Sequence, residues 1–193
     1  MPRRAITTPT RSGRAAVARR SMLYPLDVLY GRMGVALPVA RKLAPSKIPQ
    51  PYQRLLVHER EMTQTLERYV GGPVAIRVLS TSLAGRWYSR QVLLVGESSG
   101  RPAAMGAVRL RLDAFDARTR ARILKQQVPL GRVLHEGGVD YLSRPTAFFE
   151  VTPNTELMGV FWMSEAATLY GRQTQVLVGG ARVGDIVEIL PLV

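Results

Sequence analysis

The sequence predicts an α+β fold, in which helices flank a single antiparallel β-sheet. Six segments have the period-two alternation or the β-branched and aromatic content of strands. They are residues 74–80, 86–96, 102–112, 144–151, 168–178 and 181–192. The first three are separated by short loops rich in Gly and Ser, and such loops join antiparallel neighbours. Helical segments between the strands are expected to cover a face of the sheet.

Residues 1–53 do not share this pattern. We expect residues 1–21 to be a disordered basic arm, because this stretch has several arginines, no acid and no apolar period. Residues 22–53 contain five prolines without a sustained period, which predicts an extended strap. The domain itself is expected to span residues 54–193.

The first predicted helix covers residues 54–72. Its apolar stripe consists of Leu55, Met62, Leu66 and Tyr69. The spacings of seven, four and three place these side chains on one helix face, and Gly71 and Gly72 are typical of a helix end. His58 is expected on the surface of this helix. Its HEREM segment has Met62 where a zinc-protease motif requires a second histidine.

Three further segments complete the domain. Residues 113–127 read as a helix that begins at Asp113 and Asp116 and ends before Pro129. The segment 128–138, VPLGRVLHEGG, places a helix start next to Leu130, where backbone N–H groups could bind an anion or serve only as a cap. The last two strands are joined at 179–180, Gly-Gly, which predicts a tight hairpin.

Composition excludes several classes of protein. The chain has 193 residues and no apolar run near the ~20 residues that cross a bilayer, so we expect a cytoplasmic protein without a membrane span. It has no cysteine and two histidines, His58 and His135, so neither a disulfide framework nor a zinc site of the usual kind is expected. The net charge is +13, but residues 1–50 carry ten basic residues against one acid. A nucleic-acid partner rests on the arm alone and is not expected.

Arg90 is the most unusual residue of the predicted sheet. It shares a strand face with Tyr88, Val92 and Leu94. Burying a guanidinium there costs several kcal/mol unless an anion meets it. The anion could be a ligand or an internal carboxylate, and an edge strand with both faces in water would need neither.

Glu188 repeats this anomaly with the opposite sign. It shares a face with Ile186 and Leu190 near the end of the last strand. Arg90 and Glu188 could form a structural salt bridge. Alternatively, they could stand apart across a cavity and hold a flat ligand that has a carboxylate at one end and a hydroxyl at the other.

Six segments in order resemble the chorismate pyruvate-lyase family, in particular its bacterial 4-hydroxybenzoate synthase branch. They are LLVHEREMTQTLERY (55–69), the strand of Arg90, VPLGRVL (128–134), SRPTAFFEV (143–151), LYGR (169–172) and VEILP (187–191). The resemblance covers roughly residues 52–191. It implies a chorismate lyase-like fold, a single antiparallel sheet with flanking helices, in which an aromatic product is buried under mobile flaps.

The resemblance also implies roles for individual residues. Arg90 would bind the ring carboxylate, assisted by the main-chain N–H groups of Met62 and Leu130. Glu188 would face the ring hydroxyl, either as a base or only as a hydrogen-bond partner. Arg132 and Arg172 lie in matching motifs, where each could be a second cation for the substrate or a solvated charge.

The implied activity is a carbon-oxygen lyase that eliminates pyruvate from chorismate and leaves 4-hydroxybenzoate, with Arg90 and Glu188 as catalytic residues. Aromatisation drives the reaction, so neither metal nor organic cofactor is needed. The alternative is a non-catalytic binding module for a small aromatic carboxylate, because relatives of this fold also serve as sensing domains of transcription regulators. No helix-turn-helix pattern precedes the domain, which favours the enzyme.

Overall fold

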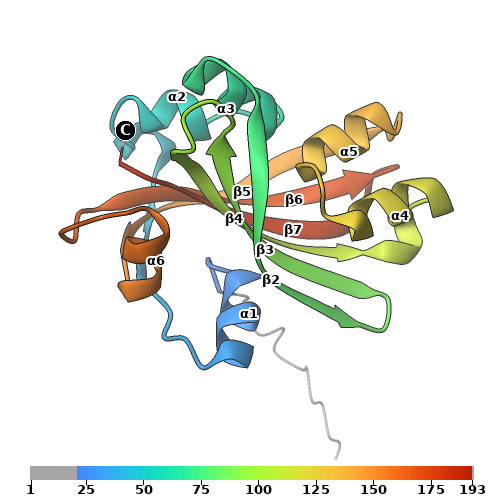
Figure 1. Cartoon of the computed structure of the whole chain (residues 1–193), viewed down its shortest axis with the longest axis horizontal. Helices are drawn as coiled ribbons and strands as arrows, with labels where there is room; N and C mark the ends of the chain where they lie inside the picture. The colour runs from blue at the N-terminus through green and yellow to red at the C-terminus, as the bar shows by residue number, and fades with distance from the viewer. Residues whose placement is uncertain (1–20, 193) are drawn as a thin grey trace, which may run out of the picture.

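Seven strands form one antiparallel sheet in the computed structural model, which describes residues 21–192 (Figure 1). The strands are β1 (Val39–Leu43), β2 (Val74–Ala84), β3 (Trp87–Gly96), β4 (Pro102–Arg111), β5 (Tyr141–Thr152), β6 (Leu169–Val178) and β7 (Ala181–Leu190). Their order across the sheet is β1-β5-β6-β7-β4-β3-β2. The predicted α+β fold with one antiparallel sheet and flanking helices is confirmed.

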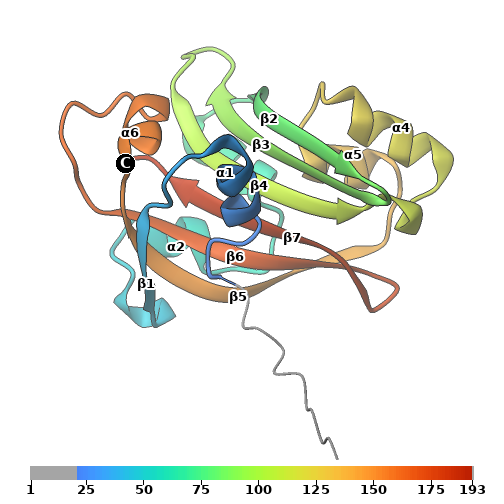
Figure 2. The ribbon, with the colours of Figure 1, turned by 90° about the horizontal axis from the view of Figure 1, so that it is seen from below.

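Helices cover both faces of this sheet (Figures 1 and 2). One face carries α2 (Tyr52–Leu56), α3 (Met62–Val70), α4 (Ala117–Lys125) and α5 (Leu130–Glu136), and the other carries α1 (Leu26–Met33) and α6 (Thr155–Val160). Short 3-10 helices occupy Pro45–Lys47 and Leu112–Ala114. The central strands are therefore buried on both sides.

Strand β3 shows how alternation divides the two cores. Leu93 and Val95 pack with α1 and α6 in one hydrophobic cluster. Leu94 packs with α2 and α3 on the opposite face, and Tyr88 packs with α4 and α5 there. Arg90 lies between Tyr88 and Leu94 in this alternation, so it belongs to the face covered by α2 to α5.

The helix predicted over 54–72 is two helices. Helix α2 ends at Leu56 and α3 begins at Met62, with a turn at 57–61 between them. The cause is a distant side chain: the Arg172 Nη1 atom donates to the carbonyl oxygens of Leu56 and His58, at 3.1 Å and 2.9 Å. Both carbonyls therefore bind a guanidinium instead of continuing a helix. Helix α3 ends as expected at Gly71, whose φ is 74°.

Residues 22–53 are not an extended strap. They contain α1, whose Leu26, Leu29 and Tyr30 are buried against the sheet. They also contain β1, which pairs with β5, so this segment belongs to the same sheet as the rest of the chain. The basic arm predicted at 1–21 lies outside the described residues except for Ser21.

The C-terminal half follows the sequence more closely. Asp116 caps α4, because its carboxylate accepts from the Thr119 backbone N–H at 2.8 Å. Gly179 and Gly180 join β6 to β7 with φ of 56° and 76°, the left-handed values that a two-residue type I′ hairpin requires. Among the described residues, no helix has the length and apolar character needed to cross a membrane.

Candidate functional site

A cavity of about 80 Å³ lies between the sheet and helices α3 and α5. Its floor is formed by β3, β4, β6 and β7, and its roof by the first turns of the two helices. Most of the wall is apolar, including Val92, Leu94, Val108, Leu134, Val176 and Ile186. One water molecule needs ~10–15 Å³ of such volume, so the cavity has room for a small organic molecule.

Arg90 reaches this cavity from β3 as a buried cation. Arg90 is 2% exposed, and its Nη1 atom is buried without a hydrogen-bond partner. Burial lowers the pKa of Arg90, and the adjacent Tyr88 hydroxyl opposes that shift. An arginine stays protonated in proteins even so. Among residues 21–192, no carboxylate forms an ion pair with it.

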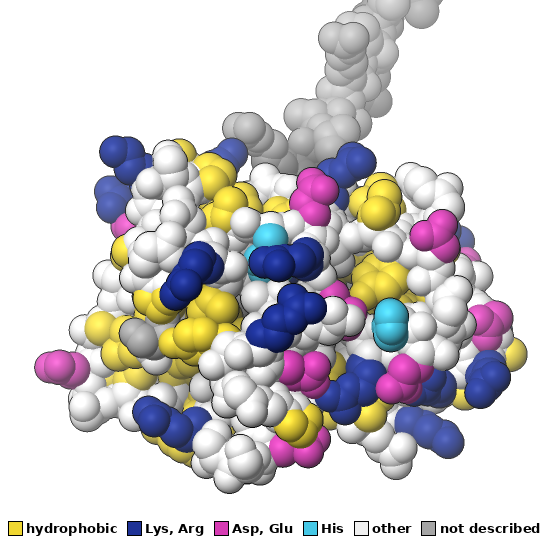
Figure 3. Space-filling model, turned by 90° about the horizontal axis from the view of Figure 1, so that it is seen from above, with side chains coloured by type: hydrophobic (Ala, Val, Ile, Leu, Met, Phe, Trp, Pro, Cys, Tyr) yellow, Lys and Arg dark blue, Asp and Glu magenta, His cyan; other side chains and the backbone are white. Residues whose placement is uncertain are grey.

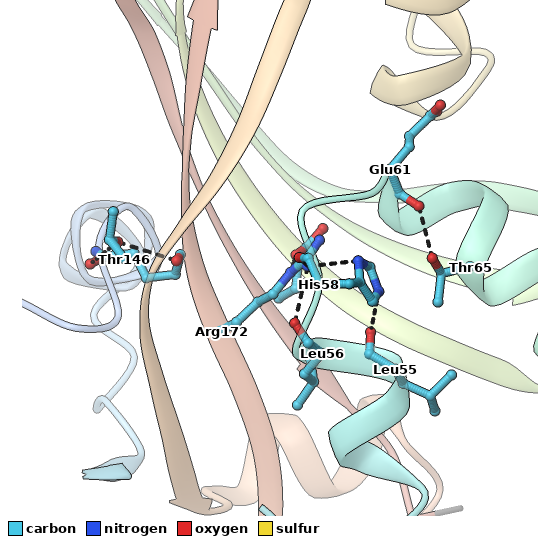
Figure 4. Close-up of polar contacts among 9 residues, drawn as sticks. Leu55, Leu56, His58, Glu61, Thr65, Thr146 and Arg172 are labelled. Atoms are coloured by element: carbon cyan, nitrogen blue, oxygen red, sulfur yellow. Dashed lines mark hydrogen bonds and ion pairs between the residues drawn. The ribbon is translucent and has the colours of Figure 1, made fainter. Parts of the chain in front are cut away.

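The second arginine of the cavity is paired through its Nε and Nη1 atoms. Arg172 Nε donates to Glu188 Oε2 at 2.6 Å, while Nη1 binds the turn between α2 and α3 (Figure 4). The two residues are opposite one another in the register of β6 and β7. The structural salt bridge expected for Glu188 therefore exists, but its partner is Arg172 and not Arg90.

Register explains why Arg90 and Glu188 do not meet. Arg90 pairs across the sheet with Val108, which pairs with Ile186. Glu188 lies in the neighbouring row, opposite Gly106. The row offset and the intervening strand keep the two charges from pairing directly.

His58 is not on a helix surface as expected. It lies in the turn between α2 and α3, half-buried beside Arg172, with its Nε2 atom 2.9 Å from the Leu55 carbonyl oxygen (Figure 4). Burial lowers the pKa of His58, and the neighbouring Arg172 charge lowers it further. A neutral imidazole fits this position next to a cation.

Five of the six predicted site residues line one cavity. They are Met62, Arg90, Leu130, Arg172 and Glu188. Met62 and Leu130 are the first residues of α3 and α5, where backbone N–H groups have no partner within the helix. Arg132 lies elsewhere: it pairs with Glu67 on the outer side of these helices and is absent from the cavity wall.

Glu61 is a cavity residue that sequence reasoning missed. It precedes α3, and its side chain points away from Arg172 (Figure 4). A methyl group at Gly131 would overlap the Glu61 carboxylate, so this carboxylate lies against the first turn of α5. Burial raises the pKa of Glu61, and a hydrogen bond from the Tyr141 hydroxyl opposes the shift.

Two floor positions were also missed. Thr174 of β6 is 1% exposed, and its hydroxyl is buried without a partner. Gly106 lies between Val92 and Glu188 in the paired strands, and its missing side chain opens the floor. A Cβ atom there would meet only Val92 Cγ2 at 3.6 Å and the Val187 carbonyl oxygen at 3.9 Å, which are ordinary contacts.

No known protein-family model and no curated protein sequence matches this chain. Solved structures match its fold. PhnF from Mycobacterium smegmatis aligns with a TM-score of 0.55 and 7% identity over 70% of this chain and 65% of its own, so the chain spans about two thirds of PhnF. Gene product SA0254 of Staphylococcus aureus aligns with a TM-score of 0.52 and 5% identity over 70% of this chain and 90% of its own.

A third structure is described as the ligand-binding domain of a GntR-family transcriptional regulator from Bordetella bronchiseptica. It aligns with a TM-score of 0.48 and 14% identity over 61% of this chain and 85% of its own. At these identities the likeness concerns the fold alone. The fold implied by the resemblance to chorismate lyases is present, while membership of the lyase branch is not shown.

The expected lyase activity is wrong for this chain. Neither PhnF nor SA0254, which share the fold, is described as a lyase. The site agrees with this correction, because Glu188, the expected base or hydroxyl partner, is bound to Arg172 at 2.6 Å. Glu188 therefore lies in the cavity wall as one half of a buried ion pair.

Proposed function

We propose that this domain is a non-catalytic module that binds a small organic carboxylate in the cavity between the sheet and helices α3 and α5. The observation that carries the proposal is the Arg90 guanidinium, which is buried in the cavity wall with its Nη1 atom unpaired. The fold alone does not assign a ligand.

The energetics of Arg90 favour an anionic ligand. A buried, unpaired charge costs several kcal/mol, and a planar carboxylate can accept two parallel hydrogen bonds from a guanidinium. Arg172 offers no comparable site, because Glu188 and two backbone carbonyls already accept from it. The carboxylate of the ligand is therefore assigned to Arg90.

The remaining wall selects for an apolar and flat body. The side chains of the cavity wall next to Arg90, Val92 and Val108, are aliphatic, and the missing side chain of Gly106 leaves extra space in the floor. A ring or a short branched chain fits such a space better than a hydrated polar group does. A small aromatic carboxylate satisfies both the cation and the apolar wall.

The outer surface over the cavity gives no support to a nucleic-acid ligand. Seen from the side of α2 and α3, basic and acidic side chains are interspersed over this face (Figure 3). Binding to phosphate backbones uses a continuous basic surface.

Calorimetric titration of benzoate tests the proposal. We expect the unaltered protein to bind benzoate, and Arg90→Met to lose about 2–5 kcal/mol of binding free energy, the range for truncating one partner of a buried charge pair. Arg132→Met is the matched control, because it removes the same charge from a residue outside the cavity. Equal affinity of the Arg90→Met and Arg132→Met variants would contradict the proposal.

A further inference from the structure

We infer that Glu61 reads the end of the ligand remote from its carboxylate, accepting a hydrogen-bond donor there and rejecting a second negative charge. This inference rests on the proposed function, because it assumes that Arg90 holds one carboxylate. It concerns which carboxylates the cavity accepts.

Two of the charged side chains on the cavity wall remain available to a ligand. Four charged side chains line the cavity: Glu61, Arg90, Arg172 and Glu188. Arg172 and Glu188 neutralise each other at 2.6 Å. Arg90 and Glu61 remain, and no ion pair joins them among the described residues. The cavity therefore offers one cation and one anion to the same ligand.

These two groups lie on opposite layers of the site. Arg90 belongs to β3, in the floor, whereas Glu61 belongs to the turn before α3, in the roof. The Glu61 side chain points toward α5, where its carboxylate lies against Gly131 (Figure 4). A ligand whose carboxylate binds Arg90 thus presents its other end to the roof.

The partners of Glu61 leave acceptor capacity free. The Tyr141 hydroxyl donates to it, and a carboxylate has about four acceptor positions. The other charged groups that act on Glu61 are His135 and Arg132 of α5 and Glu67 of α3. Arg132 is paired with Glu67, and within residues 21–192 no arginine or lysine forms an ion pair with Glu61. The free acceptor positions of the Glu61 carboxylate can therefore accept a hydrogen bond from an N–H or O–H group of the ligand, and its negative charge repels an anionic group.

A second buried polar group supports a ligand with two polar ends. The Thr174 hydroxyl is on the cavity floor, is 1% exposed and has no hydrogen-bond partner in the protein. Buried hydroxyls are normally paired, so an unpaired one in a cavity wall indicates a ligand or water atom there. Thr174 is on β6, three strands away from β3, in the row of the sheet that also contains Arg90.

Three probes that share one ring and one carboxylate test the inference. Benzoate, 4-aminobenzoate and terephthalate differ only in the group opposite the carboxylate: hydrogen, a donor or a second anion. For the unaltered protein we expect 4-aminobenzoate to bind at least about threefold more tightly than benzoate, and terephthalate at least about tenfold more weakly, because like charges in a partly buried site repel strongly.

The variant Glu61→Gln keeps the shape of the side chain and removes its charge. It should bring terephthalate to within about threefold of benzoate. Glu136→Gln is the matched control, since it removes the same charge from an ion pair with Arg122 outside the cavity and should preserve the ranking of the three probes. The order of the three affinities is measured on the unaltered protein, so it tests the inference even if Glu61→Gln does not fold.

The outcomes separate the two proposals. Failure of all three probes to bind at millimolar concentration would overturn the proposed function. Binding of benzoate together with equal or tighter binding of terephthalate would overturn only the role of Glu61. Retention of the tenfold discrimination in folded Glu61→Gln would also overturn that role.

Discussion

Replacing Arg90 with methionine should stabilise the ligand-free protein. Arg90 is 2% exposed and leaves its Nη1 unpaired, so the folded state carries the cost of a buried charge that the neighbouring Tyr88 hydroxyl offsets only in part. A single unsatisfied buried group costs about 1–3 kcal/mol. Exchange of buried ionic groups for apolar ones of similar size can add 1–4 kcal/mol of stability. We therefore expect the free energy of unfolding to rise by about 1–4 kcal/mol in Arg90→Met.

Urea denaturation in a buffer free of carboxylates and phosphate measures this change, and thermal unfolding should follow it. For a domain of this size 1 kcal/mol corresponds to about 2–4 °C in Tm. Arg132→Met is the control and should shift the unfolding free energy by less than about 1 kcal/mol, as expected for a partly exposed ion pair. A clear loss of stability in Arg90→Met would refute the reasoning, because it would mean that contacts of the guanidinium within the protein outweigh the cost of burying its charge.

Three further predictions concern the other groups of the cavity. Arg172→Met should destabilise the protein by about 3–5 kcal/mol because it strands Glu188, and adding Glu188→Leu should recover much of that loss in the same denaturation assay. Gly106→Val should abolish benzoate binding in a calorimetric titration, because the added methyl groups enter the cavity. Its Tm should stay within a few degrees, because a Cβ atom at this position meets only ordinary contacts. Unchanged benzoate affinity would show that this part of the floor does not belong to the binding site. The raised pKa of Glu61 means that the folded state binds its proton more tightly than the unfolded state, so this residue should reduce stability as pH rises from about 4.5 through the raised pKa. Glu61→Gln should remove that decline in a series of urea curves, and an identical pH profile would contradict the cause.

Local sequence was sufficient for the strands and for the anomaly on β3. Alternation located six of the seven strands, and it placed Arg90 on the same face as Val92 and Leu94 before any contact was known. Glycines marked the β6–β7 hairpin and the end of α3. These features depend on residues close together in the chain, which is why they could be predicted.

Features set by distant residues were not predictable. The break between α2 and α3 is caused by Arg172, which lies more than 100 residues further along the chain. The helical period of 54–72 contains no sign of it. Helix α1 has only eight residues, which are too few to show a clear helical period in the sequence. Its packing against the sheet is evident only in the structure.

The pairing of charges shows the same limit. The sequence identified Arg90 and Glu188 as misplaced charges, and it could not assign their partners because strand register was unknown. Register puts Arg172 opposite Glu188 and leaves Arg90 in another row. Glu61 was missed because a glutamate within the helix predicted over 54–72 is unremarkable until α5 is packed beside it.

The proposed binding of a carboxylate to Arg90 would also couple the abundance of this protein to that ligand. An anion that binds only the folded state adds RT ln(1 + [L]/Kd) to stability, about 2.7 kcal/mol at one hundred times Kd. Proteases degrade many proteins through their transiently unfolded population, which such a term would reduce about a hundredfold. We therefore expect a cell that lacks the ligand to clear the protein faster than one that contains it.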